Sequence, residues 1–126
     1  LSHPNRFHIP LLFFGDVIKP EYKGKIYSRI GNQTDLVATL LQQMGISSHR
    51  YHWSRDLFNK TTPQIAFYNS KDAFGVITPE QVLSFDNIGK IINYNQNRSY
   101  PVAKNDSLLN IAKAYYQKVY DEFLKY

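Results

Sequence analysis

One short helix with clear signals at both ends constrains the fold more than any other feature. At its start, either Thr34 caps the free N–H groups, or Asn32 caps them and Asp35 reaches back. At its end, Gly45 predicts a left-handed residue, after which Ile46 folds back onto Leu41 in a Schellman ending. The sequence therefore predicts a helix of about three turns over residues 34–44. Its apolar stripe has helical spacing: Leu36, Val37, Leu40, Leu41 and Met44.

The residues before this helix suggest strands. Ile9–Phe14 is a nearly unbroken apolar run that contains Pro10 and stops at Gly15, which is typical of an interior strand buried on both faces. Ile26–Ile30 is a candidate short edge strand. Strand, loop and helix in this order predict half of an α/β unit. We therefore expect Leu40 and Leu41 to be buried against the sheet.

The second half of the chain reads as antiparallel. Gln64–Asn69 and Phe74–Thr78 are rich in β-forming residues and predict a hairpin. Val82–Asp86 and Lys90–Tyr94 predict a second hairpin or meander. Asn95–Ser99 is a turn cluster. Between the first helix and these strands, residues 47–62 have no clear period and predict a structured loop.

A longer helix is predicted at about 106–125, capped by Asn105 or Asp106. We expect this helix to cover one face of the antiparallel sheet rather than to bind a partner. Its stripe follows helical spacing: Leu108, Leu109, Ala112, Tyr115, Tyr116, Val119, Tyr120 and Phe123. The predicted class is α+β or an α/β fragment, with a mixed, partly antiparallel sheet.

Composition narrows the function classes. A chain of 126 residues predicts a single domain over 1–126, and the lack of cysteine excludes disulfides and thiolate metal sites. The net charge of +5 would suit an anionic partner, but the basic residues are scattered, and no nucleic-acid-binding motif occurs. No apolar run reaches the roughly 18 residues of a membrane span. Because the chain begins at Leu1 and no signal peptide precedes it, we expect a piece of a longer protein.

Three strings together resemble a known family: FHIPLLFFG at 7–15, QTDLVATLL at 33–41, and Gly45-Ile46. They are similar to the C-terminal part of the catalytic domain of lipoteichoic acid synthase-like phosphoglycerol transferases, in the sulfatase branch of the alkaline phosphatase superfamily. The segment 53–58 (WSRDLF) resembles the segment that follows in many members. The resemblance covers roughly residues 3–90. It implies that residues 1–126 form the C-terminal subdomain of a larger alkaline phosphatase-like fold.

The resemblance also implies which parts of the chemistry lie elsewhere. Enzymes of this family use a divalent metal, commonly manganese or zinc, with a threonine nucleophile and an Asp-His pair. No Asp-His-Gly motif occurs in this chain, and Thr39 matches a structural threonine of the family helix. We therefore expect no catalytic residue and no metal ligand in this chain.

His3 and Arg6 precede the first predicted strand, in the segment that leaves the metal-binding turn in the family, and are candidate substrate-adjacent residues. Arg6 suits a phosphate oxygen, and His3 suits a hydrogen bond or proton transfer to substrate. The plainer interpretation is an exposed terminal segment. We expect His8 to be packed. His49 and His52 have a spacing that a metal could use, but no third ligand accompanies them.

The resemblance implies a scaffold portion of an extracytoplasmic phosphoglycerol transferase or sulfatase-like hydrolase that is inactive alone. The alternative is a self-standing binding or interaction module without catalysis. The parent would be anchored at the extracytoplasmic face of a bacterial inner or plasma membrane and act on an anionic lipid headgroup or a sulfate or phosphate ester. Expected partners are the remainder of the catalytic domain and, for the isolated chain, further copies in a dimer or higher oligomer. These copies would pair through Ile9–Phe14 or exchange the N-terminal segment.

Overall fold

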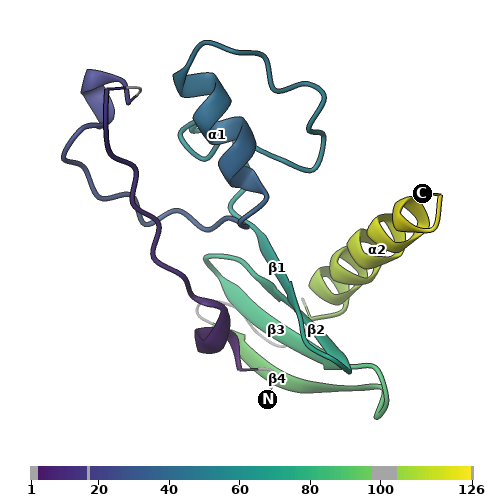
Figure 1. The fold of residues 1–126 in the computed structure, drawn as a ribbon. Coiled ribbons are helices and arrows are strands. Elements are labelled where there is room, and N and C mark those ends of the chain that lie inside the picture. The colour runs from purple at the N-terminus through teal and green to yellow at the C-terminus, as the bar shows by residue number, and fades with distance from the viewer. Residues whose placement is uncertain (1–2, 17, 98–104, 126) are drawn as a thin grey trace. The chain divides into compact units, whose positions relative to one another are not determined.

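Four strands form a single antiparallel meander (Figure 1). The computed structural model describes residues 3–16, 18–97 and 105–125. The strands are β1 (Ala66–Asn69), β2 (Ala73–Ile77), β3 (Gln81–Asp86) and β4 (Ile91–Asn97), paired in sequence order. Both predicted hairpins are thus confirmed. The turn predicted at Asn95–Ser99 begins too early, because β4 continues to Asn97; residues 98 and 99 lie outside the described residues.

The long helix α2 (Asn105–Phe123) covers one face of this sheet, as predicted. Successive strand residues point to opposite faces, so alternate apolar residues of β2 and β3 meet the helix. The capping side chains expected at Asn105 and Asp106 lie outside the described residues. The core contains these buried side chains: Phe74, Val76, Leu83, Phe85, Leu108, Leu109 and Ala112.

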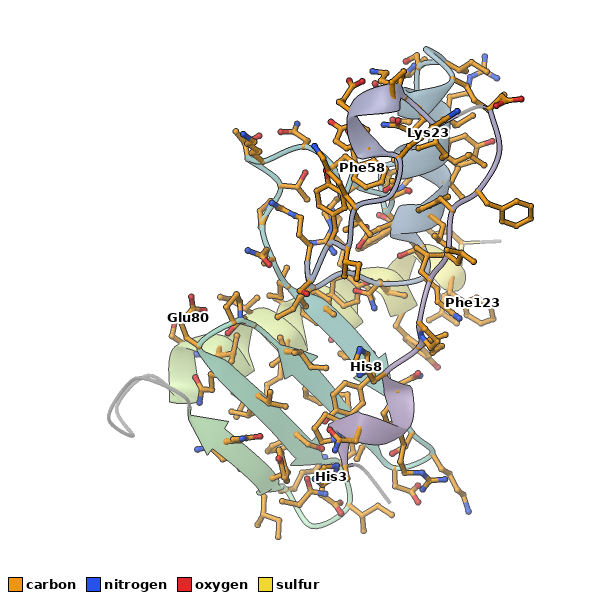
Figure 2. All side chains as sticks on the ribbon, turned by 90° about the vertical axis from the view of Figure 1, so that its left-hand side faces the viewer. His3, His8, Lys23, Phe58, Glu80 and Phe123 are labelled. Carbon is orange, nitrogen blue, oxygen red and sulfur yellow. The ribbon has the colours of Figure 1, made fainter. Side chains whose placement is uncertain are left out.

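A short 3-10 helix, η1 (Pro4–Phe7), lies on the opposite face of the sheet (Figure 2). The Phe7 ring stacks on the Tyr68 ring, with 4.5 Å between centroids. The Tyr68 ring in turn lies across Gly75 on the neighbouring strand, where a Cβ atom would collide with the ring. Burial raises the pKa of the Tyr68 phenol, and the adjacent Ser84 hydroxyl offsets this only in part.

The chain forms two compact units. One comprises the residues up to His8 together with those from Ile65 onward, and the other comprises Ile9–Gln64. The second unit holds a 3-10 turn, η2 (Pro20–Tyr22), and the short helix α1 (Asp35–Gln43). Neither α1 nor α2 is long and apolar enough to cross a membrane. The prediction of a single domain over 1–126 stays a prediction.

Both ends of α1 follow the sequence signals. Gly45 has a φ of 72°, and the Ile46 N–H donates to the Leu41 carbonyl at 2.9 Å, as the Schellman ending requires. At the start, the Asp35 carboxylate accepts from the Asn32 N–H at 2.8 Å. Thr34 makes no capping bond with its side chain. The expected reach of Asp35 back to Asn32 is therefore confirmed, whereas the expected side-chain cap from Thr34 is wrong.

Two predicted strands of the second unit do not form. Ile9–Phe14 and Ile26–Ile30 have no β pairing, and Phe14 and Ile26 are 83% and 95% exposed. A strand exists only where a second strand satisfies its N–H and C=O groups, and the described part of this unit contains no strand to pair with. The α/β half-unit, and the strand edge on which self-pairing was expected, are absent from the described residues.

The side of α1 that is buried also differs from the prediction. Leu40 is 37% exposed and Leu41 is only partly buried, so neither is buried as predicted. The buried residues of α1 are Asp35, Ala38, Thr39 and Gln43. The helix turns its most polar side inward, and the reason lies in the loop that it contacts.

Candidate functional site

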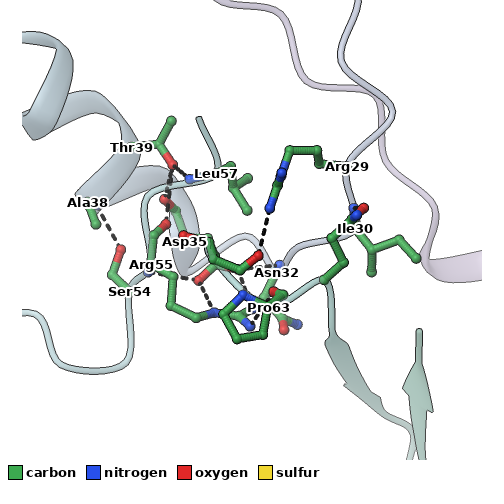
Figure 3. A network of polar contacts seen from close by, with 12 residues as sticks. Arg29, Ile30, Asn32, Asp35, Ala38, Thr39, Ser54, Arg55, Leu57 and Pro63 are labelled. Carbon is green, nitrogen blue, oxygen red and sulfur yellow. Dashed lines mark hydrogen bonds and ion pairs between the residues drawn. The ribbon is translucent and has the colours of Figure 1, made fainter. Parts of the chain in front are cut away.

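A buried ion pair lies at the start of α1 (Figure 3). The Asp35 side chain is 0% exposed, and Arg55 Nη2 donates to its Oδ2 at 2.6 Å. Its Oδ1 accepts from the Arg55 backbone N–H at 2.9 Å and from Arg55 Nε at 3.0 Å. With the bond from Asn32, the carboxylate accepts four N–H donors. This buried charge is thus both paired and hydrogen-bonded, as burial demands.

Thr39 extends the same network one turn along the helix (Figure 3). Its hydroxyl donates to the Asp35 carbonyl at 2.6 Å and accepts from the Leu57 N–H at 2.9 Å. The Ser54 hydroxyl accepts from the Ala38 N–H at 2.7 Å. Hydrogen bonds that involve side chains therefore hold residues 54–57 along α1. Thr39 is fully buried in this contact, which accords with the structural role expected of it.

Aromatic rings hold the segment before α1. The Tyr22 ring stacks on Phe58 with 4.3 Å between centroids and a 10° interplanar angle, and Tyr27 meets Phe58 edge-on. Arg29 Nη2 also donates to the Thr62 carbonyl at 2.6 Å. Figure 2 shows Phe58 close to the η2 region. These contacts order the segment but leave the apolar run 9–14 mostly uncovered.

A pocket of about 260 Å³ opens between α1 and the loop that follows it. We call it the α1 pocket; its lining residues are Thr34, Val37, Arg50, Tyr51, His52, Trp53 and Ser54. The surface that these residues turn to the pocket is mostly apolar, and the Ser54 hydroxyl already accepts from the Ala38 N–H. Arg50 and His52 are exposed and supply the basic side chains. Such a pocket suits an apolar group beside an anion.

The candidate substrate-adjacent residues lie in the other unit, on η1. His3 caps η1, with Nδ1 accepting from the Asn5 N–H at 3.3 Å, and its ring meets Tyr94 edge-on at 5.0 Å. Arg6 is exposed in the last turn of η1. The two residues therefore share one short segment on the sheet, and their contact with a substrate stays a prediction. His8 is exposed, so the expectation that it is packed is wrong.

The other histidines do not form a metal centre. The Ser47 hydroxyl lies 2.9 Å from His49 Nδ1, and the His52 ring lies beside Trp53. Within residues 3–16, 18–97 and 105–125, no group of three or more His, Cys, Asp or Glu side chains is placed to hold a metal ion. The described residues therefore do not fit the divalent metal that the family resemblance implies for a parent enzyme.

Sequence reasoning missed the Asp35–Arg55 pair. It assigned Asp35 to the helix N-terminus and left Arg55 in a loop without period. The available signal was the i, i+4 spacing of Asp35 and Thr39, which places two hydrogen-bonding side chains on one side of the helix. The side with Asp35 and Thr39 lies next to the apolar stripe of α1. The spacing alone did not show which of these two sides of the helix is buried.

Comparison with known proteins gives no match: no family model, no curated protein and no solved structure matches this chain. The family resemblance thus rests on the residues quoted for it.

Proposed function

We propose that this chain is the C-terminal scaffold portion of the catalytic domain of an extracytoplasmic, metal-dependent phosphoglycerol transferase or sulfatase-like hydrolase, inactive alone. The observation that carries the proposal is the uncovered apolar run. Leu11, Leu12 and Phe14 are exposed in a segment whose composition is that of an interior strand. An uncovered apolar patch of this kind marks an interaction surface. The remainder of the catalytic domain is the partner that would cover it.

In this proposal the chain supplies support and one wall of the site. The nucleophile and the metal ligands come from the remainder of the domain. A bound manganese or zinc ion would supply charge neutralisation at the phosphate or sulfate and a lowered pKa for the attacking oxygen. From this chain, the Arg6 guanidinium would pair with an ester oxygen, and His3 would hydrogen-bond the substrate. The substrate class is an anionic lipid headgroup or a sulfate or phosphate ester, at the outer face of a bacterial membrane.

The most direct test is the reading frame upstream of Leu1. We expect it to encode membrane spans, a threonine-centred nucleophile motif and an Asp-His-Gly motif. A start codon within a few codons of Leu1 would contradict the proposal and favour a self-standing binding module.

A second test follows the amides of Ile9–Phe14 by hydrogen exchange. We expect rapid exchange in the isolated chain, because these amides have no strand partner, and protection when the upstream part is co-expressed. Protection in the isolated chain would show that the N–H groups of this segment already have hydrogen-bond partners. That result would remove the main support for the proposal.

The isolated chain should hydrolyse neither p-nitrophenyl phosphate esters nor sulfate esters, with manganese or zinc added. Turnover by the purified chain that is lost in both the His3→Ala and Arg6→Ala variants would contradict the assignment of the reactive groups to a missing part. An exposed-residue variant, Lys71→Ala, is the matched control.

A further inference from the structure

The α1 pocket and the end of α2 are two uncovered apolar features, the first with Arg50 beside it and the second with Asp121. The pocket lies in the second unit. Val37 forms part of its wall and also belongs to the exposed apolar stripe of α1, together with Leu40 and Met44. Arg50 extends a guanidinium from the same loop. Among the described residues, no ion pair of Arg50 is recorded. The pocket thus offers apolar walls with a positive charge beside them.

The last turn of α2 carries the complementary features. Tyr120, Phe123 and Leu124 are exposed, Phe123 by 71%. The Leu124 N–H donates to the Tyr120 carbonyl at 3.0 Å, so helical bonding continues to this residue. Residues at i, i+3 and i+4 share one side of a helix, which is the spacing of anchors that enter an apolar groove. We call these three residues the α2 anchors.

A carboxylate lies at the border of this anchor side. Asp121 follows Tyr120 directly, and it is exposed. Its Oδ1 accepts from Gln117 Nε2 at 2.9 Å, a neutral donor that leaves the negative charge in place. In such a contact, apolar side chains would meet apolar walls, and Asp121 would face the opposite charge of Arg50.

We propose that the α2 anchors of one copy dock in the α1 pocket of a second copy, with Asp121 pairing with Arg50. A reciprocal exchange gives two identical contacts related by a two-fold axis, so the assembly closes as a dimer. Three anchors bury a small area, so the contact belongs to the weak, transient class, with a Kd between about 1 μM and about 1 mM. This interface uses neither the Ile9–Phe14 run nor η1, so it stands independently of the proposed function.

The chain contains its own reporter for this contact. Trp53 is the single tryptophan and lines the α1 pocket. Filling the pocket with Phe123 removes water from the indole, so its emission should shift to shorter wavelength as the concentration rises. The same samples go to sedimentation equilibrium, from about 1 μM to about 1 mM, which brackets the expected Kd.

Phe123→Asp should raise the dimer Kd at least about tenfold, because it places a carboxylate where the central anchor enters an apolar pocket. Arg50→Asp and Asp121→Arg should each raise the Kd about three- to tenfold. The double variant restores the attraction and should return the Kd to within about threefold of the parent. Ile88→Asp, at an exposed apolar residue outside both features, is the matched control and should leave the Kd unchanged.

Three results would overturn the proposal. The first is a monomer mass in sedimentation equilibrium over the whole concentration range. A dimer that Phe123→Asp leaves intact is another, since it would place the interface elsewhere. The third is a monomer whose Trp53 emission changes with Phe123→Asp at every concentration, since the contact would then lie within one chain. Failure of the charge-reversal pair to rescue the dimer would remove Asp121 and Arg50 from the interface.

Discussion

The helices α1 and α2 look alike in the sequence and are buried in opposite ways. Each has an apolar stripe at helical spacing. In α2, Leu108, Leu109 and Ala112 of the stripe are buried against the sheet. In α1, the residues with no exposure are Asp35 and Thr39, and Val37 and Leu40 of the stripe are exposed. A helix therefore buries the side for which the neighbouring element supplies apolar contacts or hydrogen-bond partners. That side need not be the apolar one.

The neighbours explain this difference. The sheet offers α2 the apolar residues Phe74 and Leu83 on a surface whose backbone groups are already paired. The loop at 54–57 presents to α1 backbone N–H groups and a guanidinium, and side chains of α1 accept their hydrogen bonds. Five variants would sharpen or break the comparison.

The largest effect should come from the ion pair at the start of α1. Arg55→Ala leaves the fully buried Asp35 carboxylate without its charged partner, so the second unit should lose about 3–5 kcal/mol of stability. Urea unfolding followed by Trp53 fluorescence reports on this unit. Arg50→Ala, which removes an exposed arginine nearby, is the control. Equal midpoints for the two variants would show that the buried pair contributes nothing.

Next comes the apolar side of α2. Leu109→Ala removes a buried side chain from the core and should cost about 2–5 kcal/mol. Hydrogen exchange of the β3 amides follows this unit separately. Ile111→Ala, on the exposed side of the same helix, should cost well under about 1 kcal/mol. A comparable loss in both variants would mean that α2 does not pack on the sheet as described.

The polar side of α1 has a matched pair of threonines. Thr39→Val keeps the shape of the side chain but leaves the buried Leu57 N–H without its acceptor, so we expect a loss of about 1–3 kcal/mol. Thr34→Val changes an exposed threonine that makes no capping bond and should be nearly neutral. If Thr34→Val proves the more damaging by Trp53-monitored unfolding, the hydroxyl network is misassigned.

High pH should lower the free energy of unfolding of the unit that contains α2. Burial raises the pKa of the Tyr116 phenol, as does the neighbouring Tyr115. The unfolded tyrosine releases its proton near pH 10. Above that pH the unfolded state binds fewer protons than the folded one, so stability falls, by at most about 1.4 kcal/mol per pH unit. Below pH 10 this contribution is fully present.

Thermal melts between about pH 9 and about pH 11.5 test this pH dependence. Tyr116→Phe should flatten the fall in the melting temperature, while Tyr51→Phe, at an exposed tyrosine, should not. A fall of the same slope in the parent and in Tyr116→Phe would assign the alkaline sensitivity to other groups.

The smallest effect should come from the apolar stripe of α1. Leu40→Ala would cost about 2–5 kcal/mol if this residue were buried against a sheet, as the sequence predicts. Because Leu40 is 37% exposed, we expect a loss below about 1 kcal/mol. Measured at low concentration, a loss above about 2 kcal/mol would show that the stripe is covered within one chain.

The sequence by itself determined the local features of this protein. The left-handed Gly45, both hairpins and the long C-terminal helix were all predicted from residues close together in the chain. The bond from Asn32 to Asp35 was part of one of two capping alternatives. Each depends on contacts within a few residues or on the period of one segment, which the sequence states directly. The sequence also placed His3 and Arg6 on one short segment.

Only the tertiary structure decided which surfaces meet. The run Ile9–Phe14 has the composition of an interior strand, but pairing depends on a second strand, and composition does not reveal whether one is present. The inward side of α1 depended on Arg55, twenty residues away from Asp35. Burial of a charge is favourable only when a partner supplies both the opposite charge and the hydrogen bonds. That condition involves residues distant in the chain, and so it is met or missed in three dimensions alone.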